Sequence, residues 1–172
     1  LVLDHVQFRL HNRFGRHRFG LTGAPPAEIA APIDVRGDIR GVADNDWRRA
    51  RGDLYVRLDY ADVAAWREWL PLPGPIAGGE GAVRLWLALE EGATREVVAD
   101  LGLADVSMQL DERLPRLQLA HVAGRVGWRS GAVGREMFTR ALTFETAAGE
   151  RLGPTDLELR LTDAAEGRSA SG

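Results

Sequence analysis

Histidine is a common metal ligand, and three of the four histidines recur every six residues, at His5, His11 and His17. On one straight strand an even spacing would place them on the same face. The sequence predicts a turn at Gly15, however, and none of the three has a carboxylate or second histidine at a metal-ligand spacing. We therefore expect surface histidines and no metal site. His121 stands alone and leads to the same expectation.

The sequence contains little that would support nucleophilic or acid–base catalysis. The chain has no cysteine, no serine in a G-x-S-x-G elbow, and no lysine for a phosphate-binding P-loop. Two carboxylates must face each other in a cleft to act as acid and base. Close pairs occur at three places: Asp59 and Asp62, Glu90 and Glu91, and Asp111 and Glu112. We expect most of these to be solvated, and we predict no catalytic residue, no cofactor and no enzymatic activity.

The overall charge argues against another class of function. The net charge is −3 and the isoelectric point is about 5.8, whereas a nucleic-acid-binding surface is normally basic. No apolar run reaches the roughly 18 residues that a membrane-spanning helix needs. The sequence begins at Leu1, already inside an alternating segment, so we expect a fragment of a longer protein.

The elements that would carry any site are strands. In GAVRLWLALE (81–90) every second residue from Val83 to Leu89 is a large aliphatic, which is typical of an extended strand with one apolar face. Similar alternation predicts about nine strands in series, several of ten or more residues, and the first two form a hairpin around Gly15. The phase slips by one near Ala104–Asp105, which predicts a bulge there.

One segment has helical spacing. In DVAAWREWLPLP, Asp62 can cap the N-terminus, Trp66 and Trp69 share a face, and Pro71 ends the helix. The two indoles fit either ordinary core packing or an amphipathic cover packed against an apolar groove.

The absence of a β-α-β rhythm favours a mainly β, antiparallel meander with one short helix over a parallel sheet. We expect a single β-rich domain over residues 1–165 and a polar, disordered tail over residues 166–172. Alternation alone leaves two architectures open, a long curved sheet that forms a groove and a closed β-sandwich, because a period of two records a buried face and not what buries it.

Several phrases together resemble a known family: RLHNRFGRHRFGLTGAPPAEIAAPIDVRGDIRG, GDLYVRLDYADVAAWREWL, GAVRLWLALEEG, ADLGLADVSMQLDERLPRLQLAHVAGRVGWR and LTFETAAGERLGPTDLELRLTD. Their order and wording are similar to the central region of the YhdP-type, AsmA-like family of Gram-negative envelope proteins. The resemblance covers about residues 1–163 and contains no catalytic motif.

The resemblance implies a periplasmic part of an inner-membrane-anchored protein, built as a chain of β-groove repeats. Such a groove would conduct phospholipid acyl chains towards the outer membrane and support outer-membrane integrity. It favours the curved, AsmA-like groove over the sandwich. The implied partners are acyl chains and neighbouring repeats of the parent chain, with no nucleic acid and no membrane-spanning segment in this fragment.

The candidate groove residues are aliphatic and aromatic side chains from the alternating strands. They are Val6, Phe8, Leu10, Leu54, Val56, Leu58, Val83, Leu85, Leu87, Leu89, Leu101, Leu103, Leu117 and Leu119. Trp66 and Trp69 are the candidates for a cover at one end. Two alternatives remain: a structural β-sandwich module of the cell envelope that binds protein, and, with least support, a hydrolase of envelope polymers.

Overall fold

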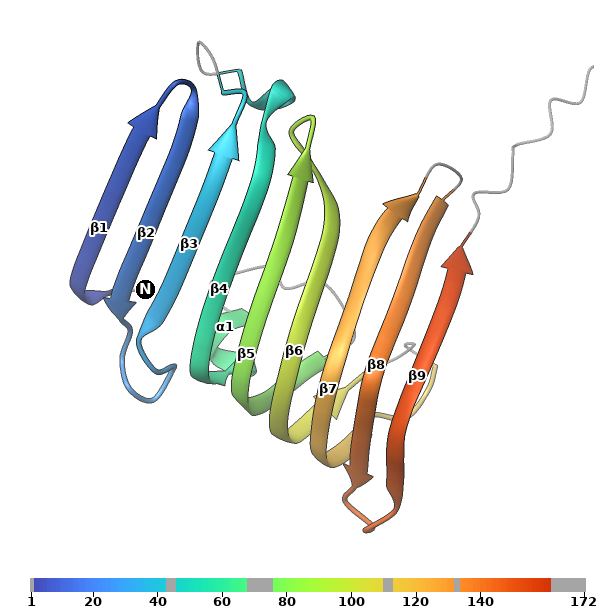
Figure 1. Cartoon of the computed structure of the whole chain (residues 1–172). Coiled ribbons are helices and arrows are strands. Elements are labelled where there is room, and N and C mark those ends of the chain that lie inside the picture. The colour runs from blue at the N-terminus through green and yellow to red at the C-terminus, as the bar shows by residue number, and fades with distance from the viewer. Residues whose placement is uncertain (1, 43–45, 68–75, 110–112, 132–133, 162–172) are drawn as a thin grey trace, which may run out of the picture.

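The protein is an open, curved sheet in the computed structural model, which describes residues 2–42, 46–67, 76–109, 113–131 and 134–161 (Figure 1). Nine strands form one antiparallel sheet in which the order in space is the order in sequence. The strands are β1 Asp4–Arg13, β2 Arg16–Ala24, β3 Ile33–Arg40, β4 Arg51–Asp62, β5 Ile76–Glu90, β6 Ala93–Met108, β7 Leu117–Gly131, β8 Gly134–Thr146 and β9 Arg151–Leu161. The predicted antiparallel meander is confirmed.

Two tight turns fix the register of neighbouring strands. The β1–β2 hairpin turns at Phe14 and Gly15, with φ of 48° and 69°. The β5–β6 hairpin turns at Glu91 and Gly92, with φ of 53° and 74°. Positive φ at both central residues is the conformation of the two-residue turn whose twist matches that of a hairpin. The turn predicted at Gly15 is therefore present.

The predicted phase slip in β6 is also present. Asp105 has φ of 50°, a conformation in which the residue no longer alternates with its neighbours. As a result Leu103 and Val106, three positions apart, pack into the same buried cluster. The irregularity keeps apolar side chains on one face over the whole of this 16-residue strand.

The predicted helix is present, and its predicted end lies outside the described residues. α1 spans Val63–Arg67, and the Asp62 carboxylate caps it by accepting hydrogen bonds from the backbone N–H groups of Ala64 (2.9 Å) and Ala65 (3.1 Å). Trp69, Leu70 and Pro71 lie outside the described residues, as does the tail 166–172. A 3₁₀ turn, η1 (Trp47–Arg49), precedes β4.

The sandwich alternative is wrong. The nine strands belong to one sheet, with β1 and β9 at its two edges, and no second sheet occurs in the part of the chain that the structure describes. Among the described residues, Val106 is the only large side chain that is less than 2% exposed. A single layer of strands leaves one apolar face without an opposing layer.

Candidate functional site

The main feature of the sheet is a face on which apolar side chains line up from strand to strand, here called the apolar face. Directly paired residues of neighbouring strands point to the same side, so the register can be followed across the sheet. One row runs through Leu10, Phe19, Gly37, Leu54, Leu87, Val97, Trp128, Met137 and Leu159. The next row runs through Phe8, Leu21, Val35, Val56, Leu85, Ala99, Val126, Thr139 and Leu157.

These two rows form a continuous apolar track. Each takes one residue from every strand, and the polar groups in the two rows are the hydroxyl of Thr139 and the indole N–H of Trp128. Neighbouring strands lie about 4.8 Å apart, so eight intervals span about 38 Å. The one gap, at Gly37, is filled by the ring of Phe19, since a Cβ at Gly37 would lie 2.3 Å from that ring. The track is therefore unbroken from edge to edge.

The structure brings all fourteen predicted groove residues to the apolar face. Six lie in the two rows: Phe8, Leu10, Leu54, Val56, Leu85 and Leu87. Leu58, Val83 and Leu101 form part of a third row, and Leu89 lies beyond Leu87 on the same side. Leu103 and Leu119 belong to a buried cluster, Leu117 pairs with Met108 beside it, and Val6 lies next to Gly23.

Sequence reasoning left out several residues of the same face. The missing members were on strands that had been recognised: Phe19, Leu21, Val35, Val97, Val126, Trp128, Met137, Leu157 and Leu159. Alternation within each strand carries the signal for these positions. What it lacks is the register between strands, which joins separate apolar faces into rows.

The apolar face is open to solvent over much of its extent. At the β1 edge Phe8 is 60% exposed, and at the β9 edge Leu157 is 57% exposed. Between the edges, the row residues Leu85 and Leu87 are half-buried by their neighbours in the sheet. The buried apolar side chains among the described residues belong mainly to two small clusters, around Trp66 and around Val106, with Ile39 and Ala50 buried outside them.

Those clusters lie at one end of the strands, where α1 crosses the apolar face. In Figure 1, α1 lies behind the sheet near the ends of β4 and β5. Trp66 packs with Ala30, Ile33 and Ala61, and Val63 packs against the cluster around Val106. The helix therefore covers one end of this face and leaves the two rows uncovered. The other cover candidate, Trp69, is outside the described residues.

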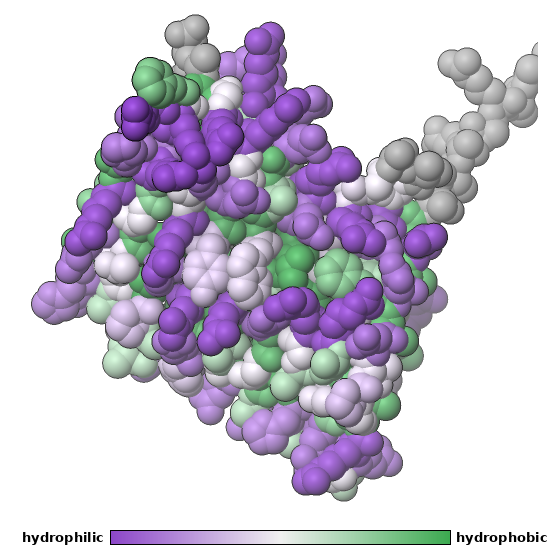
Figure 2. Space-filling model, in the orientation of Figure 1, coloured by the Kyte–Doolittle hydropathy of each residue, from purple (hydrophilic) through white to green (hydrophobic). Residues whose placement is uncertain are grey.

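The opposite face, here called the polar face, carries charged side chains (Figure 2). Hydrogen bonds from Arg16, assisted by Arg18, lower the pKa of Asp38 to about 2. Hydrogen bonding from Arg129 lowers the pKa of Glu136 to about 2, and the charge of Arg160 adds to this shift. Exposed pairs of this kind add little stability, but they keep the polar face hydrated.

The paired carboxylates do not converge on a cleft. Asp59 is bound by Arg57 at 2.8 Å, Glu90 by Arg95 at 3.0 Å, and Glu91 by Arg51 at 3.5 Å. Asp111 and Glu112 lie outside the described residues. Asp59, Glu90 and Glu91 are therefore each held in an ion pair with an arginine and not in an acid–base arrangement.

The histidines also stay apart. His11 pairs with Arg18 and His17 with Asn12, so His11 lies on the polar face and His17 on the apolar face. Among the residues that the structure describes, no group of three or more His, Asp or Glu side chains is placed to hold a metal ion.

Comparison with known families identifies the group to which the protein is related. A model of the YhdP protein family matches residues 1–172, the whole chain. The chain belongs to the YhdP family. Membership indicates a Gram-negative envelope protein of the AsmA-like type, a non-enzymatic class. No curated protein and no solved structure gives a significant match. No helix among the described residues of this YhdP-family chain is long and apolar enough to cross a membrane.

Proposed function

We propose that the protein is a non-enzymatic segment of a periplasmic, bridge-like protein that shields and conducts phospholipid acyl chains between the inner and outer membranes. By supplying lipid it would support outer-membrane integrity. The observation that carries this proposal is the pair of apolar rows that cross all nine strands without interruption. Fatty acyl chains are the ligand that such a floor fits, because contact with it needs no specific polar group.

The length of the track suits an acyl chain. The hydrocarbon core of a bilayer is about 30 Å thick, so one leaflet's acyl chains extend about 15 Å. A floor of about 38 Å therefore accommodates a whole chain and leaves room for it to move along the floor. Burying a methylene completely is worth about 0.8 kcal/mol. A tail covered on one side gains about half of that, or about 4 kcal/mol for ten methylenes.

The composition of the track favours sliding over tight binding. Val, Leu, Phe and Met offer similar dispersion contacts at each strand, so a tail that moves by one strand exchanges one set of contacts for an equivalent set. Thr139 introduces the single hydroxyl of the two rows, near the β9 edge. A uniform floor holds a tail without fixing it at one place.

The edges of the sheet support a place within a longer assembly. Among the described strands, β1 and β9 each pair on one side only, and unpaired strand edges readily accept a further strand. Pairing with neighbouring repeats of the parent chain would continue both rows beyond this segment. The parent would be anchored in the inner membrane, with this segment in the periplasm.

Site-specific photo-crosslinking tests the proposal. A photoreactive residue at position 87 faces the rows, and one at position 84 of the same strand faces the opposite side. Mass spectrometry of the chain purified gently from a Gram-negative host is expected to find phospholipid adducts at 87 and not at 84. Equal yields at the two positions, no lipid adduct at all, or protein adducts alone at 87 would overturn the proposal.

A further inference from the structure

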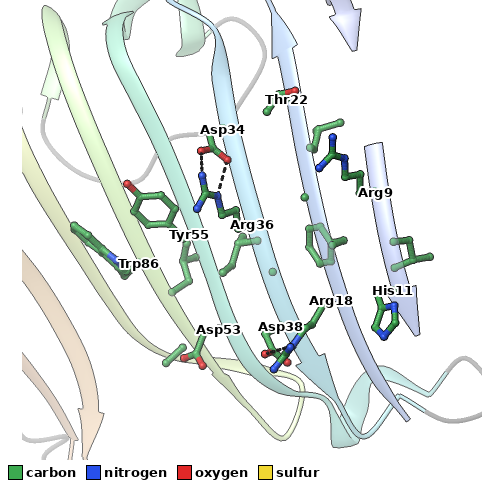
Figure 3. Close-up of a pocket in the computed structure, with 18 of the residues that line it drawn as sticks. Arg9, His11, Arg18, Thr22, Asp34, Arg36, Asp38, Asp53, Tyr55 and Trp86 are labelled. Atoms are coloured by element: carbon green, nitrogen blue, oxygen red, sulfur yellow. Dashed lines mark hydrogen bonds and ion pairs between the residues drawn. The ribbon is translucent and has the colours of Figure 1, made fainter. Parts of the chain in front are cut away.

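A hollow on the polar face is distinct from the apolar rows. Its volume is about 910 Å³, and it lies over β1 to β6 on the side that carries Arg9, Arg36 and Trp86 (Figure 3). Ligand-binding pockets typically have volumes of 300–1,000 Å³. The backbone of the sheet separates this hollow from the acyl track, so it needs an explanation of its own.

The floor of the hollow is low because two small residues lie under it. Gly20 pairs with Arg9 on one side and with Arg36 on the other. A Cβ at Gly20 would meet no atom within 4 Å. Ala88 lies on β5, three strands from Gly20, between Asp53 and Glu96. Larger side chains around these two positions form the walls.

An aromatic pair forms the central wall. Tyr55 and Trp86 are direct partners on β4 and β5, with ring centroids 5.4 Å apart and planes at 47°. Both are half-buried, so part of each ring faces solvent, and Figure 3 shows them side by side. Arg125 lies 5.6 Å from the Trp86 ring. Amphipathic rings of this kind combine a broad apolar surface with a polar group at one end.

Hydrogen-bonding groups of both kinds surround the pair. Asp53 and Glu96 lie on either side of Ala88, about 10 Å apart across two strand intervals. Neither carboxylate makes a hydrogen bond or an ion pair with a described residue, and neither does Arg9 on the opposite wall. Arg36, by contrast, is held by Asp34 at 2.7 Å. Free acceptors therefore stand at one side of the hollow and a free donor at the other.

The charge of the lining decides which ligand fits. Three arginines face four carboxylates, namely Arg9, Arg18 and Arg36 against Asp34, Asp38, Asp53 and Glu96. The lining itself therefore offers no excess of positive charge to a phosphate or another anion. A ligand with many hydroxyl groups can donate to the carboxylates and accept from arginine, and the C–H face of a sugar ring can stack on an aromatic side chain.

We infer that this hollow binds an uncharged oligosaccharide of pyranose rings, with one ring stacked on Tyr55 and Trp86 and its hydroxyl groups bonded to Asp53, Glu96 and Arg9. Sugar recognition on the polar face would act independently of acyl chains on the apolar face. In an envelope protein it would hold the segment against a glycan while lipid passes on the other side.

Titration of the isotope-labelled chain with chitotetraose and with cellotetraose, followed by NMR, tests the inference. We expect shifts around Tyr55, Trp86 and Gly20 with at least one of the two sugars. In Gly20→Leu the new side chain fills the floor, and we expect binding at least ten times weaker. The matched control is Gly102→Leu, on the same face, where a Cβ also meets no atom within 4 Å.

Each other outcome counts against the inference. It fails if neither sugar shifts these resonances, if Gly20→Leu binds as tightly as the parent, or if Gly102→Leu weakens binding equally. It also fails if inorganic phosphate, titrated in parallel, binds at the same residues. The leucine side chain of Gly20→Leu extends into open space. The variant therefore tests the site without removing the cross-strand Tyr55–Trp86 contact that helps to hold the sheet together.

Discussion

A charge placed in the middle of the track should lower the affinity for acyl chains. Leu87 lies at the centre of one row, between Leu54 and Val97, and its side chain is half-buried. In Leu87→Glu a carboxylate that must stay hydrated replaces the branched apolar end of the leucine side chain in the floor. The matched control is Ala82→Glu, which adds the same charge on the same strand at an exposed position on the polar face.

The expected magnitude follows from the number of methylenes displaced. A hydrated carboxylate keeps about four methylenes away from the floor, at about 0.4 kcal/mol each for a tail covered on one side. The loss is about 1.6 kcal/mol, which corresponds to about a 15-fold higher Kd. Because Leu87 is half-buried, we expect the free energy of unfolding to fall by only about 1 kcal/mol.

A fatty acid with a fluorescent acyl chain measures this effect as a Kd, and thermal unfolding measures the stability of each variant. Leu87→Glu should bind the probe about 15-fold more weakly, and Ala82→Glu should bind it as the parent does. If a folded Leu87→Glu chain kept the parent affinity, or if both variants lost it equally, acyl binding by the apolar rows would be refuted.

Three further predictions concern stability. The pKa of Asp38 is lowered from 3.8 to about 2 in the folded chain, so the ionised carboxylate stabilises the fold above about pH 4 and this stabilisation is lost as the pH falls towards 2. In Asp38→Asn the free energy of unfolding should therefore depend less on pH across that range. Val106 is 0% exposed, so Val106→Ala should lower the free energy of unfolding, measured by chemical denaturation, by about 2 kcal/mol. Val6 is 51% exposed, so Val6→Ala should change it by less than about 0.5 kcal/mol. Gly52→Ala should cost more than about 1 kcal/mol, because Gly52 has φ of 154° and a Cβ there would lie 2.0 Å from the Asp38 carbonyl oxygen; a stability equal to that of the parent would contradict this reading.

Alternation predicts the strands well because each strand has one apolar face. It predicted the strand around Val83 to Leu89 and the change of phase at Asp105, because both are local properties of the chain. It could not separate an open sheet from a sandwich, because a side chain such as Leu87 alternates in the same way whatever lies opposite. That question depends on whether a second layer exists, and the structure has a single layer.

Contacts between strands were beyond the reach of sequence reasoning. The helical spacing from Asp62 to Trp69 predicted the helix that the structure describes over Val63–Arg67, and the predicted end at Pro71 stays a prediction. The partnership of Tyr55 with Trp86 depends on the register between β4 and β5, which bulges and turns set together. For the same reason the hollow on the polar face carried no signal in the linear pattern.

Phospholipids with a nitroxide on the acyl chain, added to the methyl-labelled protein, test the central claim most directly. We expect NMR line broadening of methyl groups along both rows, such as those of Val35, Leu85 and Leu157, and none at Ala88 and Val98 on the other side. Broadening spread evenly over the two faces, or confined to the polar face, would contradict the account.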